Sequence, residues 1–220
     1  CLSKVDREEG EFGTAIAELG SALETTLVPI QVPIGAQADF RGVVDLLTMK
    51  ALIFDGDNGA VTTEDIPGEV QGQADEYREK LLEAVVETND DLLTRYLEGE
   101  ELSTDEITRA LSEAVASAQI FPVLCVSGGR ALGVQPVLDA IVNLLPSPAV
   151  RAPVTGINPK TQEEVECGPD PDAPFSARVF KTVDSPTGKL SLLSVVSGHI
   201  DSDSVVYNPT RNKKERLGQL

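Results

Sequence analysis

Two short polar segments, each placed directly after residues of strand character, carry the side chains best suited to binding chemistry. Ser3-Lys4-Val5-Asp6 begins just after Leu2, and Ser127-Gly128-Gly129 follows the apolar run 120–126. Ligands of open α/β sheets bind at the carboxyl ends of the strands, so we expect both segments to face one pocket. The aspartate can accept two hydrogen bonds from the N1–H and the exocyclic amine of guanine. The lysine stem can lie along the plane of the base, and the backbone N–H that follows Val126 can donate to a carbonyl oxygen such as guanine O6.

Taken alone, a lysine and an aspartate after a strand are more often a solvated strand end than a ligand site. The rest of the chain excludes several kinds of catalysis. It contains no G-x-x-x-x-G-K-[ST] segment for cradling phosphates. Its one histidine, His199, and its three scattered cysteines cannot build a zinc site or a nucleophile–base pair. We expect no metal site and interpret His199 as a surface residue.

Charge and cysteine usage indicate the setting of the protein. The chain carries a net charge of −18, and residues 64–113 contain sixteen acidic side chains against four basic ones, which is 12 of those 18 negative charges. Such a surface repels phosphate backbones, which argues against DNA, and suits a basic protein partner or solubility alone. The odd cysteine count favours reduced thiols and a cytoplasmic protein. No apolar run is long enough to cross a membrane.

Residue periodicity predicts mixed structure in the first two thirds of the chain. We expect helices over 15–27, 73–87, 91–97, from the capping box Ser103–Glu106 onward, and over 134–145. Strands are expected at 30–34, where prolines indicate an edge strand, at 43–47, at 51–54, and as one continuous buried run over 120–126. A turn is expected over 55–59. The core face of the helix that follows the capping box should comprise Ile107, Ala110, Leu111, Ala114 and Ala118.

The last third changes to a period of two residues. Residues 149–172 are rich in Pro, Gly and Asp, which is typical of a linker. Strands are expected at 177–183, 190–196 and 204–207, in the manner of the start of a small antiparallel barrel. The chain opens on Cys1-Leu2-Ser3 without a start methionine or a signal sequence, and we interpret it as an internal fragment of a longer protein.

Several collinear segments resemble elongation factor G, a translational GTPase. Leu2-Ser3-Lys4-Val5-Asp6-Arg7-Glu8 resembles the guanine-recognition segment of that family. Residues 32–36, 40–46 and 96–102 resemble its inserted subdomain, 133–140 and 145–148 the last helix of its GTP-binding domain, and 188–190, 207–208 and 213–218 the beginning of its second domain. The resemblance covers essentially the whole chain in one order. Ser3 departs from the family, which usually carries asparagine there.

The resemblance implies a fold and a set of domains. The fold would be an α/β remnant of a GTP-binding domain with an inserted α+β subdomain, followed by the start of an antiparallel β-barrel. The implied parts are 1–29 and 119–148 of the GTP-binding domain, the insert 30–118, the linker 149–172 and the truncated barrel domain 173–220.

The resemblance also implies a function and a set of partners. The protein would be part of a ribosome-dependent GTPase that promotes translocation of tRNA and mRNA during elongation. GTP or GDP would be read by Lys4, Asp6 and the Ser127 backbone, with Ser3 as a further candidate, while Mg²⁺ would be bound by parts outside this chain. Exposed glutamates of the insert would bind the ribosomal stalk protein: Glu76, Glu79, Glu83 and Glu87. The basic segment Arg211–Arg216 would contact ribosomal RNA.

Simpler readings of these features remain open. The acidic face and the basic segment can each be an ordinary solvated surface. The parent protein can also be a ribosome-binding module that does not hydrolyse GTP, or a ribosomal-protection or release-type relative. We expect the chain by itself to be inactive as a GTPase, because the phosphate-binding parts are not encoded in it.

Overall fold

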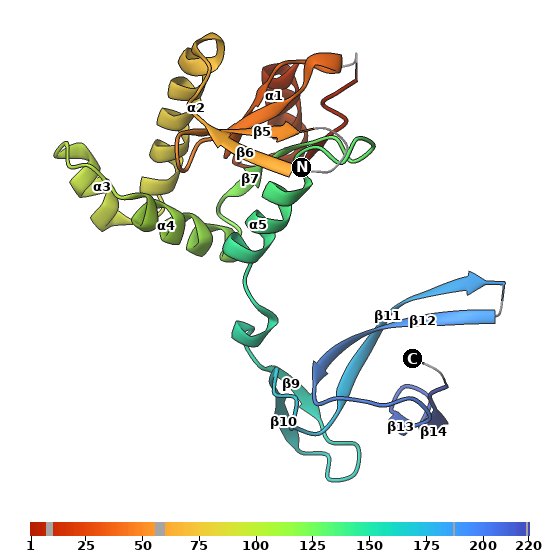
Figure 1. The fold of residues 1–220 in the computed structure, drawn as a ribbon. Coiled ribbons are helices and arrows are strands. Elements are labelled where there is room, and N and C mark those ends of the chain that lie inside the picture. Colours follow the sequence, from red (N-terminus) through yellow and green to blue (C-terminus); the bar gives the residue numbers. More distant parts are fainter. Residues whose placement is uncertain (8–10, 56–59, 187, 219) are drawn as a thin grey trace. The chain divides into compact units, whose positions relative to one another are not determined.

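The computed structural model describes residues 1–7, 11–55, 60–186, 188–218 and 220, so four residues of the turn expected at 55–59 lie outside it. The chain divides into two compact units, Cys1–Leu145 and Pro146–Leu220. Each is shown as a ribbon in Figure 1. The observed boundary lies three residues before the expected one at 148.

The first unit is built around two kinds of sheet. Parallel pairs form between β1 (Leu2–Ser3) and β8 (Cys125–Val126), and between β2 (Leu27–Pro29) and β7 (Phe121–Val123). The other sheet is antiparallel, with its strands in the order β3 (Gln31–Ile34), β4 (Gly42–Asp45), β5 (Lys50–Asp55) and β6 (Ala60–Glu64). The proline-containing strand β3 lies at the edge of this sheet, as expected.

Five helices and a 3-10 turn complete the described part of this unit. They are α1 (Phe12–Leu23), η1 (Gln37–Asp39), α2 (Gly68–Val86), α3 (Asp90–Leu97), α4 (Thr104–Ala116) and α5 (Val134–Leu144). The capping box at the start of α4 is confirmed: the Ser103 side chain accepts from the Glu106 N–H, and the Glu106 carboxylate accepts from the Ser103 N–H. Asn89 caps the start of α3, because its side-chain Oδ1 accepts hydrogen bonds from the Asp91 and Leu92 N–H groups.

One hydrophobic core joins the parts that the sequence assigned to separate domains. It contains Val28 and Leu144 from the expected GTP-binding segments, together with Val44, Leu81 and Leu111 from the expected insert. A smaller cluster of Phe40, Val43, Phe54, Cys125 and Leu132 lies beside it, and Val5 packs against this cluster. Residues 30–118 therefore do not form a core of their own.

Three predictions for this unit were wrong. The helix expected over 15–27 ends at Leu23, with Glu24 in the left-handed region, and Leu27 belongs to β2. The strand expected over 120–126 is interrupted at Leu124, because its two halves pair with different partners. Ala118 is exposed and lies beyond the end of α4, while the other four expected core residues of that helix are buried.

The second unit contains three separate antiparallel pairs. They are β9 (Val154–Ile157) with β10 (Glu164–Cys167), β11 (Ser176–Ser185) with β12 (Gly188–Ser197), and β13 (Val205–Asn208) with β14 (Lys213–Arg216). The turn η3 (Pro148–Val150) precedes them. The segment 149–172 is thus not simply a linker, since it includes the first of these pairs. The described strands form no closed barrel.

Candidate functional site

The two polar segments singled out from the sequence lie at the same edge of a parallel strand pair. Leu2 is opposite Cys125 and Ser3 is opposite Val126 in the β1–β8 pair. Because the strands are parallel, their carboxyl ends coincide, and the residues that follow each strand leave the sheet side by side. Lys4–Asp6 and Ser127–Gly129 therefore share one edge of the sheet, while the expectation that they face one ligand pocket stays a prediction.

The interruption at Leu124 explains how this edge is made. The Leu124 carbonyl accepts from the Leu2 N–H at 2.8 Å, and the Val123 carbonyl accepts from the Ile30 N–H at 3.0 Å. Successive carbonyls of an extended chain point in opposite directions, so β1 and β2 pair on opposite sides of the segment 121–126. The buried amide of Gln31 fills part of the gap, since its Oε1 accepts from the Cys125 N–H at 3.1 Å.

Asp6 stands in a tight turn that begins at Lys4. Lys4 has a φ of +63°, an uncommon conformation for a residue with a side chain, and its carbonyl accepts from the Arg7 N–H at 2.9 Å. The Lys4 side chain is exposed and Asp6 is partly buried. The Ser127 hydroxyl has the largest effect on the Asp6 carboxyl and lowers its pKa. Burial raises this pKa by less than Ser127 lowers it, and the Asp6 backbone and the charges of Arg7 and Arg130 lower it further. Asp6 is thus held as a carboxylate.

Ser127 is buried beside Asp6, with 1% of its surface exposed. Its Oγ is near enough to stabilise the Asp6 carboxylate, yet it completes no hydrogen bond of normal geometry with any described group. A buried hydroxyl left without a partner costs about 1–3 kcal/mol. The Ser127 hydroxyl and the Asp6 carboxylate are thus neighbours without a hydrogen bond of normal geometry between them.

The predicted role of the Ser127 backbone needs correction. Its N–H donates to the Leu132 carbonyl at 2.9 Å, and the Leu132 N–H donates back to the Ser127 carbonyl at 3.0 Å. The Ser127 N–H is therefore already used and cannot donate to a ligand. The next amide, that of Gly128, is exposed and makes no hydrogen bond within the described chain, so it is the amide available at this edge.

Gly133 fixes the start of α5 below the same turn. It has a φ of +77°, and a Cβ at this position would lie 2.7 Å from the Cys125 carbonyl oxygen. Only glycine combines that backbone conformation with such a close approach. The Cys125 thiol is fully buried, and burial raises its pKa to about 12. It is therefore a packing residue of this site and not a nucleophile.

The acidic side chains expected to bind a partner project into solvent from α2 and from the residue that caps its carboxyl end. Glu76, Glu79, Glu83 and Glu87 are all exposed. Glu76 is paired with Lys80 at 2.5 Å, and the Lys80 ammonium also lies 4.9 Å from the centre of the Tyr77 ring. The other three make no ion pair with a described cation, so the unpaired charge of this face comes from Glu79, Glu83 and Glu87.

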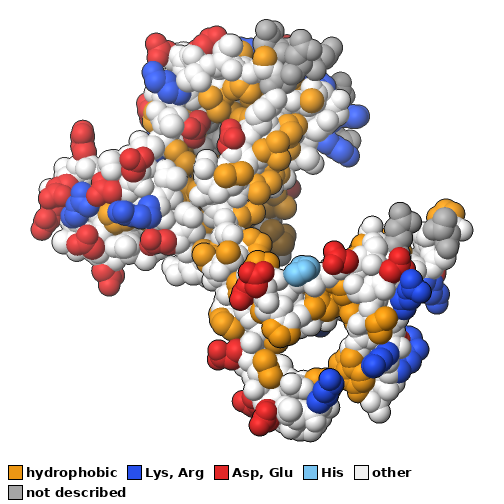
Figure 2. All heavy atoms as spheres, turned by 60° about the horizontal axis from the view of Figure 1, so that its bottom comes forward, with side chains coloured by type: hydrophobic (Ala, Val, Ile, Leu, Met, Phe, Trp, Pro, Cys, Tyr) orange, Lys and Arg blue, Asp and Glu red, His pale blue; other side chains and the backbone are white. Residues whose placement is uncertain are grey.

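The basic segment Arg211–Arg216 is largely neutralised by its own neighbours. Arg211 and Lys213 both contact Glu215, and Arg216 contacts Asp203 at 3.0 Å. Among the cations of this segment, Lys214 alone has no ion pair with a described carboxylate. In Figure 2 basic side chains are visible on this unit, and acidic ones are frequent on the helical lobe of the first unit, which comprises α2 to α4. The segment presents less free positive charge than its sequence suggested.

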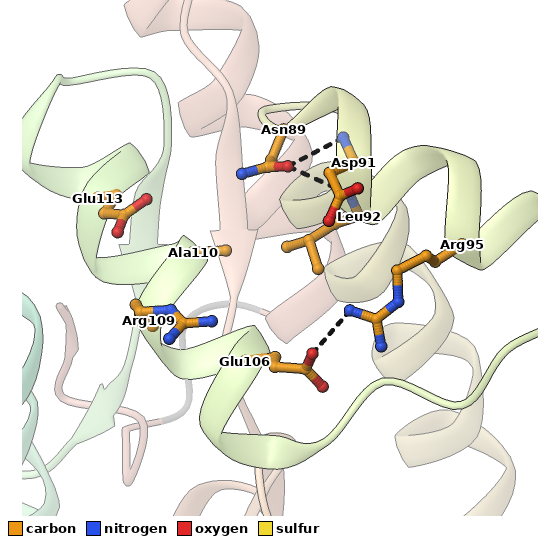
Figure 3. A pocket seen from close by; sticks show the side chains of 8 residues that line it. All are labelled: Asn89, Asp91, Leu92, Arg95, Glu106, Arg109, Ala110 and Glu113. Atoms are coloured by element: carbon orange, nitrogen blue, oxygen red, sulfur yellow. Dashed lines mark hydrogen bonds and ion pairs between the residues drawn. The ribbon is translucent and has the colours of Figure 1, made fainter.

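A small pocket between α3 and α4 was not expected from the sequence. Its volume is about 130 Å³, and Figure 3 shows the side chains that line it: Asn89, Asp91, Leu92, Arg95, Glu106, Arg109, Ala110 and Glu113. Arg95 pairs with Glu106 at 2.7 Å and with Glu100 at 2.9 Å. The pocket is therefore lined both by members of this ion-pair network and by the exposed Arg109, which forms no ion pair with a described carboxylate.

Several kinds of site are absent from the described residues. No group of three or more His, Cys, Asp or Glu side chains there could hold a metal ion. His199 is exposed, with Nδ1 2.9 Å from the Pro171 carbonyl. All three cysteines are free. Among the described helices, none is both long and apolar enough to cross a membrane.

Sequence reasoning missed two residues at the candidate base site. Gly128 was noted only as the neighbour of Ser127, because nothing in the sequence showed that the Ser127 N–H would pair with Leu132. Arg130 was not singled out, although its place directly after a glycine pair at a strand end was a usable signal.

Comparison with solved structures gives a similarity that spans nearly the whole chain. No protein-family profile matches the chain. A protein of Thermus thermophilus, known from a crystal structure, is 30% identical, with a TM-score of 0.72. The match covers 98% of this chain and 29% of that protein, so the chain spans less than a third of the protein that it resembles. The similarity supports the arrangement of elements described above.

Proposed function

We propose that this chain is the guanine-reading part, with its insert and the start of a second domain, of a cytoplasmic translational GTPase of the elongation factor G type. The supporting observation is the parallel pairing of Ser3 with Val126, which brings Asp6 and the Ser127–Gly129 turn to one sheet edge. A guanine base at this edge would offer its N1–H and amine to the Asp6 carboxylate. Its O6 would accept from the Gly128 N–H, and its face would lie on the Lys4 stem.

The chemical step belongs to the complete protein. GTP would be held at its phosphates, with Mg²⁺, by parts outside this chain, and the energy of hydrolysis would drive translocation of tRNA and mRNA on the ribosome. The unpaired glutamates of α2 would bind a basic stalk protein of the ribosome. Lys214, with the paired cations around it, would approach ribosomal RNA.

Two other functions are carried as alternatives. A ribosome-binding module without GTP hydrolysis would have the same surfaces and no need for a selective base site. A ribosomal-protection or release-type relative would share the base site and differ in its reaction on the ribosome. Ionised Asp6 beside buried Ser127 favours a selective base site over the first alternative.

The test is a change of base specificity in the complete protein that carries this chain. Asp6→Asn replaces an acceptor pair with a group that also presents donors, so GDP should bind roughly tenfold more weakly or worse. Xanthosine diphosphate, which has a carbonyl in place of the amine, should lose less or bind more tightly. Competition titration with a fluorescent nucleotide measures both. An equal loss for the two nucleotides would refute the role of Asp6.

A further inference from the structure

The candidate base site has an open side at its glycine pair. A Cβ built on Gly128 or Gly129 would meet no other atom within 4 Å. Both residues are exposed, and the Gly128 N–H makes no hydrogen bond with any described acceptor. A planar base held by Asp6 would therefore rest against backbone at this point, without a side chain of either glycine to cover it.

Arg130 lies at the tip of the turn that carries these glycines. The turn is closed by the paired hydrogen bonds between Ser127 and Leu132 and by a further bond from the Ala131 N–H to the Gly128 carbonyl at 3.4 Å. The Arg130 side chain is exposed, and its Nη1 donates to the Ala38 carbonyl at 3.4 Å. It forms no ion pair with any described carboxylate within 4.0 Å. The guanidinium is thus anchored at one nitrogen and has no other bond to a described group.

We propose that the Arg130 guanidinium covers one face of the bound base and acts as a binding residue in place of the side chains that Gly128 and Gly129 lack. The inference rests on the proposed function. A guanidinium is planar and weakly hydrated, and it stacks on aromatic faces and on nucleobases. The bond to Ala38 restricts its motion, which reduces the entropy lost when the base binds.

An electrostatic role through Asp6 is the competing explanation, because the charge of Arg130 also helps to keep that carboxyl ionised. The two roles differ in their dependence on the base. Stacking acts on the ring face and is insensitive to the groups on its edge. An effect transmitted through Asp6 acts on the edge, where the N1–H and the amine lie.

The experiment uses the complete protein and three nucleotides: GDP, inosine diphosphate (IDP) and xanthosine diphosphate (XDP). IDP lacks the exocyclic amine of guanine. Arg130→Ala should weaken GDP and IDP by the same factor, about three- to tenfold. Arg130→Lys should recover part of the lost affinity, since it keeps the positive charge but lacks the planar guanidinium. Arg7→Ala is the matched control, because it removes the other cation that lowers the pKa of Asp6 but lies outside the 127–132 turn. It should change both affinities less than twofold. Thermal unfolding of each variant verifies the fold.

Each result decides the matter. Equal losses for GDP and IDP, larger than those of Arg7→Ala, support stacking. Unchanged affinities, or a loss that is larger for GDP than for IDP and is matched by Arg7→Ala, overturn the role of Arg130 while leaving the proposed function intact. If Asp6→Asn fails to alter the preference between GDP and XDP, the proposed function fails and the inference fails with it.

Discussion

Arg95 Nη1 lies 2.7 Å from Glu106 Oε1, and this ion pair ties α3 to the first turn of α4. The same guanidinium reaches Glu100 through Nε at 2.9 Å. Glu106 also completes the capping box with Ser103. One carboxylate therefore stabilises the start of one helix and the position of its neighbour, in a lobe whose net charge is strongly negative.

This carboxylate should make the stability of the first unit depend on pH. Hydrogen bonds from Arg95, and then from Ser103, lower the Glu106 pKa from 4.5 to about 2. A lowered pKa in the folded state contributes stability that is fully present above pH 4.5 and is lost as the pH falls toward 2. Glu106→Gln keeps a side chain suited to the capping box and removes the charge, so it should reduce the slope of unfolding free energy against pH in this range. Urea unfolding at several pH values measures the slope. Glu113→Gln, on the same helix and without an ion pair to a described cation, is the matched control for removing a carboxylate.

Two glycine substitutions should have opposite effects on stability. Gly133→Ala forces a side chain into the left-handed region and against the Cys125 carbonyl, and should destabilise by about 2 kcal/mol or more. Gly72→Ala lies within α2, where a Cβ meets nothing within 4 Å, and should stabilise by about 0.5–1 kcal/mol. Chemical unfolding compares the two variants. A Gly133→Ala variant as stable as the unmodified protein would contradict the close approach described at this turn.

Charge reversal on α2 tests the proposed stalk partner. Glu79→Lys with Glu83→Lys should lower the stimulation of GTP hydrolysis by ribosomes in the complete protein, with stability changed by less than about 0.5 kcal/mol at each exposed position. Glu163→Lys with Glu164→Lys makes the same charge change in the second unit and serves as the control. Stimulation that persists at low salt, where charge pairing is strongest, would favour a purely solvated face.

The chain by itself should not hydrolyse GTP. Phosphoryl transfer depends on groups placed around the γ-phosphate, and this sequence encodes no phosphate cradle. Base contacts alone must also offset the entropy of immobilising the ligand, roughly 4 kcal/mol or more. Isothermal titration with GDP should therefore detect weak binding or none. Micromolar affinity, or turnover above a blank without protein, would show that other residues carry the nucleotide.

Local sequence signals predicted the capping box and the existence of the helices, because those features depend on neighbouring residues, but they misplaced both ends of α1 and the start of α2. The interruption at Leu124 could not be predicted, since Val123 and Leu124 are both apolar and differ only in which strand donates to their carbonyls. The β9–β10 pair was missed because its Pro- and Gly-rich flanks resemble a linker.

The candidate site was predicted only in part, because some of its features depend on turn conformation and strand pairing. The shared edge of Asp6 and Ser127 follows from two strand ends and was foreseen. The hydrogen bond from the Ser127 N–H to the Leu132 carbonyl depends on the conformation of the turn between them. Gly128 and Gly129 allow many turn conformations, so the sequence does not determine this one. The neutralisation of the basic segment by Glu215 and Asp203 likewise depends on strand pairing, which composition does not reveal.

The pairing of Leu2 with Cys125 has a consequence for the order in which the protein folds. More than 120 residues separate these partners along the chain, and contacts between distant residues form only after the entropy of closing a long loop has been overcome. The helices α2 to α4 lie entirely within that loop, and their buried side chains share one core with β2 and α5. The edge that carries Asp6 and Ser127 is therefore assembled late, together with the core that α2 to α4 share with the rest of the unit, and its presence reports that the whole first unit has reached its native topology.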